Sequence, residues 1–120
     1  YPFPGHIHGH PSILGGTQAE IVASAVARAR HPGVAGLDLL AYRAAGDVPA
    51  LIDAVCCAVS KPVIVAGSVY RPDQIDIIRR SGAAGFTIGT SALDGKFPAT
   101  GTGLEAQLRA ITACLEALPQ

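Results

Sequence analysis

The chain has 120 residues, a length typical of one domain. Nine Lys and Arg residues balance nine Asp and Glu residues, and this zero net charge argues against a nucleic-acid-binding surface. Apolar residues make up 49% of the chain and charged residues 15%, the opposite of the balance in a disordered chain. The apolar runs are far shorter than the roughly 20 residues that span a bilayer.

The cysteines and the N-terminal sequence indicate the cellular compartment of the protein. Cys56, Cys57 and Cys114 are odd in number and two of them are adjacent, which argues against a disulfide framework. No signal peptide is recognisable. These features predict a cytoplasmic protein that contacts neither a membrane nor nucleic acid, and no cofactor is expected.

Short β-rich segments alternate with amphipathic helical segments. Thr17 and Glu20 are spaced as a capping box that opens a helix. Asp47 is the expected N-cap of the next helix, and Pro72 suits the first position of a third. The expected elements, in chain order, are a weak strand at 3–8, a helix at 18–30, a strand at 37–42, a helix at 47–59, a strand at 63–66, a helix at 72–82, a strand at 85–88 and a last helix after residue 102.

The last helix has the strongest periodic pattern. Thr102 and Glu105 are spaced as a second capping box at its start. Apolar residues then recur at intervals of three and four, which predicts a continuous buried stripe. The stripe consists of Leu104, Leu108, Ile111, Leu115 and Leu118.

The alternating order of strands and helices implies an α/β fold with a parallel sheet and right-handed crossovers. A complete (βα)8 barrel needs about 250 residues, so we expect residues 1–120 to form a single (βα)4 unit, half of a TIM barrel. A flavodoxin-like open sheet with helices on both faces is the alternative. Because a half-barrel has two open sheet edges, we expect it to pair with another copy or with the missing N-terminal half of a barrel.

Asp38 is the leading carboxylate candidate for acid–base chemistry. Alternation along the strand at 37–42 places Leu37 and Leu39 against helices and Asp38 on the opposite face, toward a barrel interior or cleft. A hydrogen-bonded aspartate buried in the core is the alternative interpretation.

Three histidines occupy alternate positions near the start of the chain. On a strand, His6, His8 and His10 share one face, and a reference pKa near 6.5 suits His8 or His10 to transfer protons together with Asp38. Three imidazoles can also converge on zinc, iron or nickel, and His-X-His is similar to the first metal motif of amidohydrolases. No second histidine group follows, so we expect no metal. A solvated N-terminal segment is the third interpretation, because nearby prolines weaken the strand.

Two glycine-containing turns follow the strands at 63–66 and 85–88. Gly67 and Ser68 form the first, and Gly89, Thr90 and Ser91 form the second. Glycine lets the backbone approach a ligand closely, and free amides and hydroxyls beyond a strand favour an anion. These five residues are therefore the expected phosphate-binding group, although ordinary loop chemistry would also account for them.

Other polar residues flank these turns. Tyr42 and Arg43 close the strand at 37–42, so we expect both to bind substrate at the same end of the sheet, where Arg43 can bind a second anionic group. Lys61 precedes its strand and belongs at the opposite end. Lys96 lies beyond the second turn, and we expect it on the surface.

The stretch from 61 to 98 resembles the C-terminal part of the ribulose-phosphate-binding barrel superfamily. It is most similar to the isomerase and synthase barrels of histidine biosynthesis, with phosphoribosylanthranilate isomerase as a cousin. Ala66-Gly67-Ser68 and Ile88-Gly89-Thr90-Ser91-Ala92 correspond to the glycine turns that end the last two strands of that family. The resemblance implies that Gly67, Ser68, Gly89, Thr90 and Ser91 hold a substrate phosphate. Those isomerases have acidic residues where this chain has its histidine cluster.

The leading functional hypothesis is therefore a phosphate-binding barrel protein that acts on a phosphorylated sugar or related metabolite, with isomerase-type acid–base chemistry. A non-catalytic phosphate-ligand-binding or assembly module is the second hypothesis. A metal-dependent hydrolase that uses His6, His8 and His10 is the third.

Overall fold

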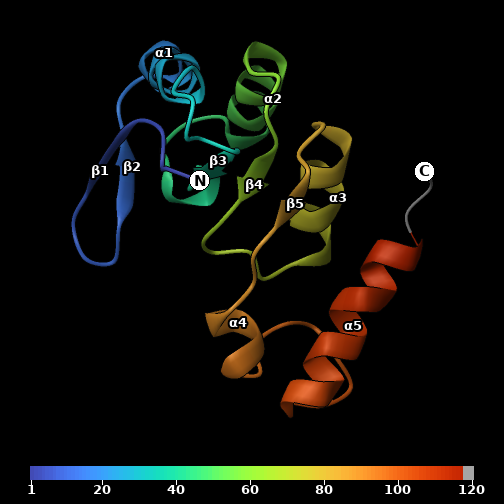
Figure 1. Ribbon diagram of the computed structural model, residues 1–120. Coiled ribbons are helices and arrows are strands. Elements are labelled where there is room, and N and C mark those ends of the chain that lie inside the picture. Colours follow the sequence, from blue (N-terminus) through green and yellow to red (C-terminus); the bar gives the residue numbers. More distant parts are fainter. Residues whose placement is uncertain (118–120) are drawn as a thin grey trace.

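The structure, a computed structural model, describes residues 1–117. Leu118 of the expected apolar stripe lies outside the described residues. No helix within 1–117 has the length and apolar character needed to cross a membrane. In chain order (Figure 1), the elements are β1 (His6–His8), β2 (Ile13–Gly15), α1 (Gln18–Ala29), β3 (Leu37–Leu39), the 3-10 turn η1 (Ala41–Arg43), α2 (Val48–Ala58), β4 (Val63–Val65), α3 (Pro72–Arg80), β5 (Gly85–Phe86), α4 (Thr90–Leu93) and α5 (Leu104–Ala117).

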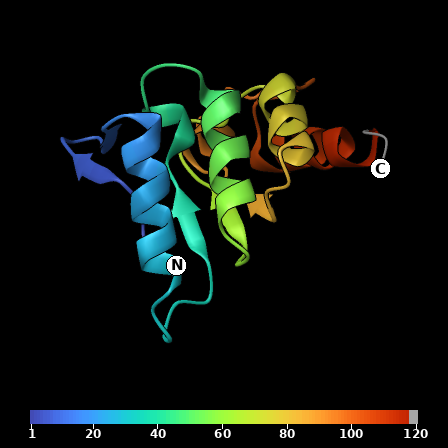
Figure 2. The same ribbon diagram turned by 90° about the horizontal axis from the view of Figure 1, so that it is seen from above.

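The fold is mixed α/β and contains a parallel three-stranded sheet in the order β3-β4-β5. Leu39 pairs with Val65, and Val65 pairs with Phe86 across the sheet. Leu39 and Val65 are fully buried. Helices α1, α2 and α3 lie side by side on one face of the sheet in both views (Figures 1 and 2). The expected strand–helix alternation and parallel pairing are confirmed for this part of the chain.

The helix starts follow the predicted capping signals. Thr17 Oγ1 accepts a hydrogen bond from Glu20 N, and Glu20 Oε1 accepts one from Thr17 N, which completes the capping box of α1. Asp47 Oδ1 accepts a hydrogen bond from Ala50 N at the start of α2. Pro72 is the first residue of α3. The side chains of Thr17 and Asp47 satisfy amides that a helix start leaves without intrahelical partners, and Pro72 has no N–H that needs one.

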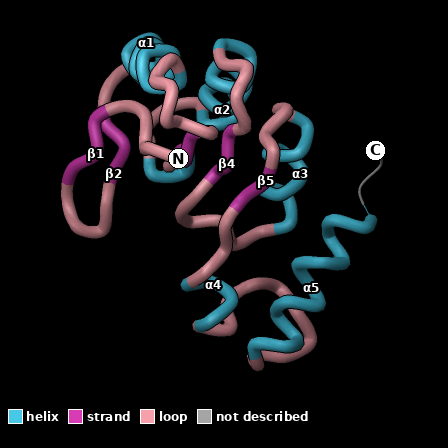
Figure 3. The backbone as a smooth tube through the Cα atoms, viewed as in Figure 1, coloured by secondary structure: helices cyan, strands magenta, loops and turns pink. Residues whose placement is uncertain are grey.

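The strand expected at 3–8 is not part of the parallel sheet. Instead, β1 pairs with β2 in an antiparallel hairpin that the sequence analysis missed (Figure 3). Gly5 has φ +84°, a left-handed conformation that glycine tolerates, and it separates this hairpin from residues 1–4. The expectation of four parallel strands is therefore wrong for β1.

Residues 1–4 lie beside β3. Asp38 N donates to Pro2 O at 3.0 Å, and a side chain at Gly36 would meet the Tyr1 ring. Farther along, Leu14 of the hairpin bridges Ala44 beyond the end of β3. The chain from Tyr1 to the hairpin thus runs in the direction of β3. The prolines in this segment have no N–H to donate, which limits the ladder that it can form.

The last helix differs from its expected form. It begins at Leu104, and Glu105 accepts hydrogen bonds from Arg109 rather than closing a capping box with Thr102. Ile111 is buried, but the leucines of the same stripe are about half exposed. Their exposed fractions are 50% for Leu104, 48% for Leu108 and 41% for Leu115.

Candidate functional site

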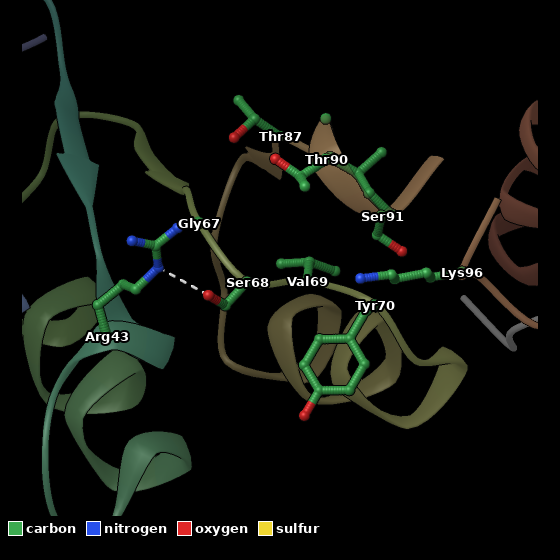
Figure 4. A pocket seen from close by; sticks show the side chains of 11 residues that line it. Arg43, Gly67, Ser68, Val69, Tyr70, Thr87, Thr90, Ser91 and Lys96 are labelled. Carbon is green, nitrogen blue, oxygen red and sulfur yellow. Dashed lines mark hydrogen bonds between the residues drawn. The ribbon is translucent and has the colours of Figure 1, made fainter. Parts of the chain in front are cut away.

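A pocket of about 370 Å³ lies at the carboxyl ends of the parallel strands (Figure 4). This end of a parallel sheet is where ligands bind in most α/β folds. The turns after β4 and β5 both contribute to it, as does the end of η1. Its lining residues are Arg43, Gly67, Ser68, Val69, Tyr70, Thr87, Ile88, Gly89, Thr90, Ser91 and Lys96.

The first turn has an unusual backbone. Gly67 has φ +83° and Ser68 has φ +60°, so two consecutive residues are left-handed. Glycine adopts this conformation easily, whereas for serine it is uncommon and needs support from the surroundings. Ser68 is thereby placed at the pocket as the sequence analysis expected.

Gln74 supplies that support, and the sequence analysis missed it. Its side chain is buried, its Oε1 accepts from Tyr70 N at 2.7 Å and from Arg71 N at 3.0 Å, and its Nε2 donates to Ser68 O at 3.1 Å. A polar residue in the first turn after Pro72 is the signal that could have identified it. Gln74 therefore positions the turn without lining the pocket.

Arg43 links the pocket to the N-terminal hairpin. Its Nε donates to Ser68 Oγ at 2.6 Å, and its Nη1 donates to Ser12 O at 3.1 Å. Within residues 1–117 its guanidinium makes no ion pair with a carboxylate, although it has further N–H groups to donate. The predicted placement of Arg43 at this end of the sheet is confirmed.

The second turn leads into the short helix α4. Gly89 precedes the helix with open space where a side chain would be, and Thr90 lines the pocket. Ser91 Oγ is buried and has no hydrogen-bond partner in the described structure. A buried hydroxyl without a partner is uncommon, because leaving it unsatisfied costs about 1–3 kcal/mol.

Lys96 also lines the pocket, and it is exposed on the surface as expected. Its backbone N donates to Ser91 O at 2.8 Å, which folds the chain back toward the second turn. Arg43 and Lys96 approach from opposite sides in Figure 4. The lining residues thus include two cations, four hydroxyl-bearing side chains besides Tyr70, and no carboxylate.

Asp38 does not line the pocket. It lies in the middle of β3, on the face opposite Leu37 and Leu39 as predicted, and its Oδ1 is buried with no hydrogen-bond partner among the described residues. Burial raises the pKa of the Asp38 carboxyl, and the positive charge at the chain start partly opposes this shift. The alternative interpretation of a hydrogen-bonded core aspartate does not fit that Oδ1 atom.

Tyr42 is also outside the pocket. Its hydroxyl donates to Gln74 O at 3.4 Å, so the ring packs toward the start of α3. Burial raises the pKa of the Tyr42 hydroxyl, and Asp73 adds to the increase. Of the two residues expected to bind substrate beside the turns, the structure brings only Arg43 to the pocket.

The histidines lie on the hairpin and outside the pocket lining. His6 and His8 are exposed and their rings stack with centroids 5.3 Å apart, while His10 follows β1 in the exposed connection to β2. No group of three His, Cys, Asp or Glu side chains in the described residues can hold a metal ion. The predicted shared face is therefore confirmed for His6 and His8, and the three histidines do not form a metal site in this arrangement.

Lys61 and the three cysteines do not line the pocket. Lys61 precedes β4, away from the pocket, where its Nζ donates to His31 O at 3.2 Å. Cys56 and Cys114 are half-buried, and Cys57 is exposed. Burial raises the pKa of the Cys56 thiol to about 11, which keeps it protonated and unreactive at neutral pH.

No protein-family model matches the sequence, and no curated protein is significantly similar to it. The chemistry of the pocket is therefore the basis for assigning a function.

Proposed function

We propose that this chain binds a phosphorylated small molecule, with the phosphate held between the turns at 67–69 and 89–91. The single observation that supports this most strongly is a pocket lined by two cations, by both turns and by no carboxylate. Charge-assisted hydrogen bonds from Arg and Lys suit phosphate oxygens, and hydroxyls add neutral donors. A volume of about 370 Å³ lies within the usual range for small-molecule sites.

The shape of the sheet supports a half-barrel rather than an open doubly wound sheet. The α1, α2 and α3 helices cover the same face (Figure 2), whereas a flavodoxin-like fold has helices on both. The pocket follows two consecutive parallel strands and includes a short extra helix. Barrel enzymes often bind phosphate with this set of elements.

Ligand binding is better supported than isomerase-type catalysis. His8, His10 and Asp38, the expected proton-transfer residues, do not line the pocket in this chain. Their positions favour the non-catalytic binding hypothesis for the chain taken alone. A metal-dependent hydrolase has the weakest support, because it would need a third ligand beside His6 and His8.

Ligand titration tests the proposal directly. Thermal unfolding is recorded with increasing inorganic phosphate, ribose 5-phosphate and unphosphorylated ribose. A ligand that binds only the folded state raises the unfolding temperature. We expect both phosphate compounds to raise it and ribose to leave it unchanged. Equal responses to ribose and ribose 5-phosphate would contradict phosphate recognition.

Two glycine substitutions provide a matched comparison. Gly89 and Gly33 both have open space where a side chain would be, and neither has a left-handed φ. Gly89→Asp introduces a carboxylate at the pocket, so we expect phosphate binding to be lost through charge repulsion. Gly33→Asp introduces the same group in a loop outside the pocket and should retain binding. Retained binding in Gly89→Asp would overturn the proposed site.

A further inference from the structure

The parallel sheet has an uncovered edge at β5. Strand order β3-β4-β5 places Gly85–Phe86 last, and within residues 1–117 no strand pairs with its outer side. The sheet face that carries Asp38 and Ile64 is also only partly buried. Parallel sheets are normally buried on both faces, and a free edge can pair with another chain.

Apolar surface adjoins this edge. Helix α5 packs with Ile111 inward, whereas Leu104 and Leu108 on the same stripe are about half exposed. Another cavity, of about 480 Å³, lies between α5, β5 and α3. It is lined mainly by apolar side chains, among them Ile75, Ile78, Phe86, Ile88, Ile111 and Leu115.

Residues 1–4 lie along the opposite edge of the sheet, beside β3. This segment runs alongside β3 and in its direction, and its Tyr1 and Phe3 side chains are 57% and 44% exposed. A new neighbour of β5 in a parallel sheet must run in the same direction as β3. Residues 1–4 run in that direction, and they also carry exposed apolar side chains.

The chain exposes more surface than a compact protein of its mass. A compact protein of 12.2 kDa exposes roughly 6,100 Å², whereas this chain exposes 6733 Å². The excess of roughly 600 Å² approaches the roughly 800 Å² per partner that a standard interface buries. Zero net charge also means that two copies do not repel each other.

We propose that a second copy of this chain docks head to tail on this surface. Residues 1–4 of one copy lie along β5 and against the exposed leucines of α5 of the other, and the same junction repeats in the opposite direction. Two copies then close a ring of eight segments, each copy contributing 1–4, β3, β4 and β5. Closure removes every free edge and buries the apolar residues at both ends.

Closure also brings new residues to the pocket. Within one copy the hairpin lies beyond the carboxyl end of β3, where Arg43 donates to Ser12 O and Leu14 bridges Ala44. In the ring, the hairpin of the second copy lies beyond the carboxyl end of β5, just as it lies beyond β3 within its own copy. The hairpin of the second copy would then lie beside the turn at 89–91.

The oligomeric state in solution tests the docking. Light scattering coupled to size-exclusion chromatography should give the mass of two copies at the higher protein concentrations. Leu108→Lys and Phe3→Glu each place a charge at both junctions of the pair and should weaken the dimer at least about tenfold. Ala113→Lys, on the polar side of α5, is the matched control and should leave the dimer intact. Circular dichroism confirms that the variants are folded.

Mixing the two defective variants tests the head-to-tail geometry. A mixed pair has one unmodified junction and one junction where Lys faces Glu, so an equimolar mixture of Leu108→Lys and Phe3→Glu should recover the dimer. A monomer at every concentration overturns the proposal, as does a dimer unaffected by either substitution. A mass that keeps growing with concentration, or no recovery on mixing, overturns ring closure. No ligand is added, so these outcomes are independent of phosphate binding.

Discussion

Arg43 is the residue on which the proposed binding most depends. It touches the hairpin through Ser12 O and the first turn through Ser68 Oγ, and its remaining N–H groups are free of carboxylate partners in the described structure. A planar guanidinium can hold Ser68 and a phosphate oxygen together. The arrangement gives Arg43 a structural role and a binding role at one time.

Replacing Arg43 separates these roles. In Arg43→Gln a side-chain amide can still bond to Ser68, but the charge is gone. We expect ribose 5-phosphate to bind about 10- to 100-fold more weakly, because a hydrogen bond to a charged group contributes about 1.5–3 kcal/mol. Isothermal titration calorimetry measures the change. Arg30→Gln, which removes an exposed charge at the end of α1, is the control, and equal affinities of the two variants would contradict the role of Arg43.

Asp38 makes the stability of the folded protein depend on pH. Burial raises the pKa of its carboxyl above the ordinary 3.8, so the folded state holds the proton more tightly than the unfolded state. Its stabilising contribution is then complete below the unfolded pKa and is lost as the pH rises through the folded pKa. Asp38→Asn cannot lose a proton and should avoid this loss.

The unfolding free energies of Asp38→Asn and of the native chain should differ by an amount that depends on pH. As the pH rises from 3.8 through the higher pKa of the folded protein, the stability of Asp38→Asn relative to the native chain should increase, and then level off. Urea unfolding at a series of pH values measures it. A constant difference would show that Asp38 ionises as it does in the unfolded chain, and a falling difference would show that folding lowers the pKa of its carboxyl; either result contradicts the prediction.

Individual residues of the site differ in how far sequence predicts them. Gly67 and Gly89 are recognisable because each directly follows a short apolar segment, where glycine is typical of a tight turn that a ligand can approach. Gln74 and Lys96 are not, because their importance arises from contacts across the turns. The expected grouping of Asp38 with the histidines failed because the chain turns away at Gly5, a feature that alternation alone does not reveal.

At the scale of elements, helix starts are predicted better than strand ends. Thr17 and Asp47 act through side chains that bond within three residues, so local spacing is sufficient to identify them. The strand at 37–42 ends early because Leu40 has φ −81° and ψ 54°, and the 3-10 turn η1 follows. That bend lets Tyr42 bond to α3, a long-range contact that local sequence does not determine.

Helix α5 is tied to the preceding loop by one buried amide. Gln107 Oε1 accepts from Phe97 N at 2.8 Å, and its Nε2 donates to Phe97 O and to Gly101 O, both at 2.9 Å. The side chain is fully buried. This residue stands within the apolar pattern of the helix, but its function is to satisfy backbone groups of the loop that follows α4.

Gln107→Leu tests this connection. The substitution leaves the backbone groups of Phe97 and the Gly101 carbonyl without their side-chain partner, so we expect the free energy of unfolding to fall by about 3 kcal/mol. Gln18→Leu, at an exposed position in α1, should change it by less than about 0.5 kcal/mol. Urea unfolding followed by circular dichroism measures both, and similar values for the two variants would contradict the anchoring role.

At the scale of the molecule, the parallel pairing was predictable because the order of strands and helices restricts the connections. The exposure of the α5 stripe was not, because periodicity identifies an apolar side without identifying what packs on it. Leu108 and Ile111 belong to the same stripe, yet one is half exposed and the other is buried. The difference follows from which elements pack on each part of the helix, and periodicity does not reveal that.

Stability should consequently be uneven across the chain. The amides of β4 and of Ala66, which donates to Leu39 O, lie in the centre of the sheet among fully buried side chains. Helix α5 is held mainly by Ile111, Gln107 and the bond from Arg79 Nη1 to Leu115 O. Hydrogen exchange should therefore show α5 opening at a lower free energy than the sheet centre when the protein is dilute. Equal protection of the two regions in a dilute monomer would show that α5 is already fully packed without a partner, and that its exposed leucines contribute no weakness.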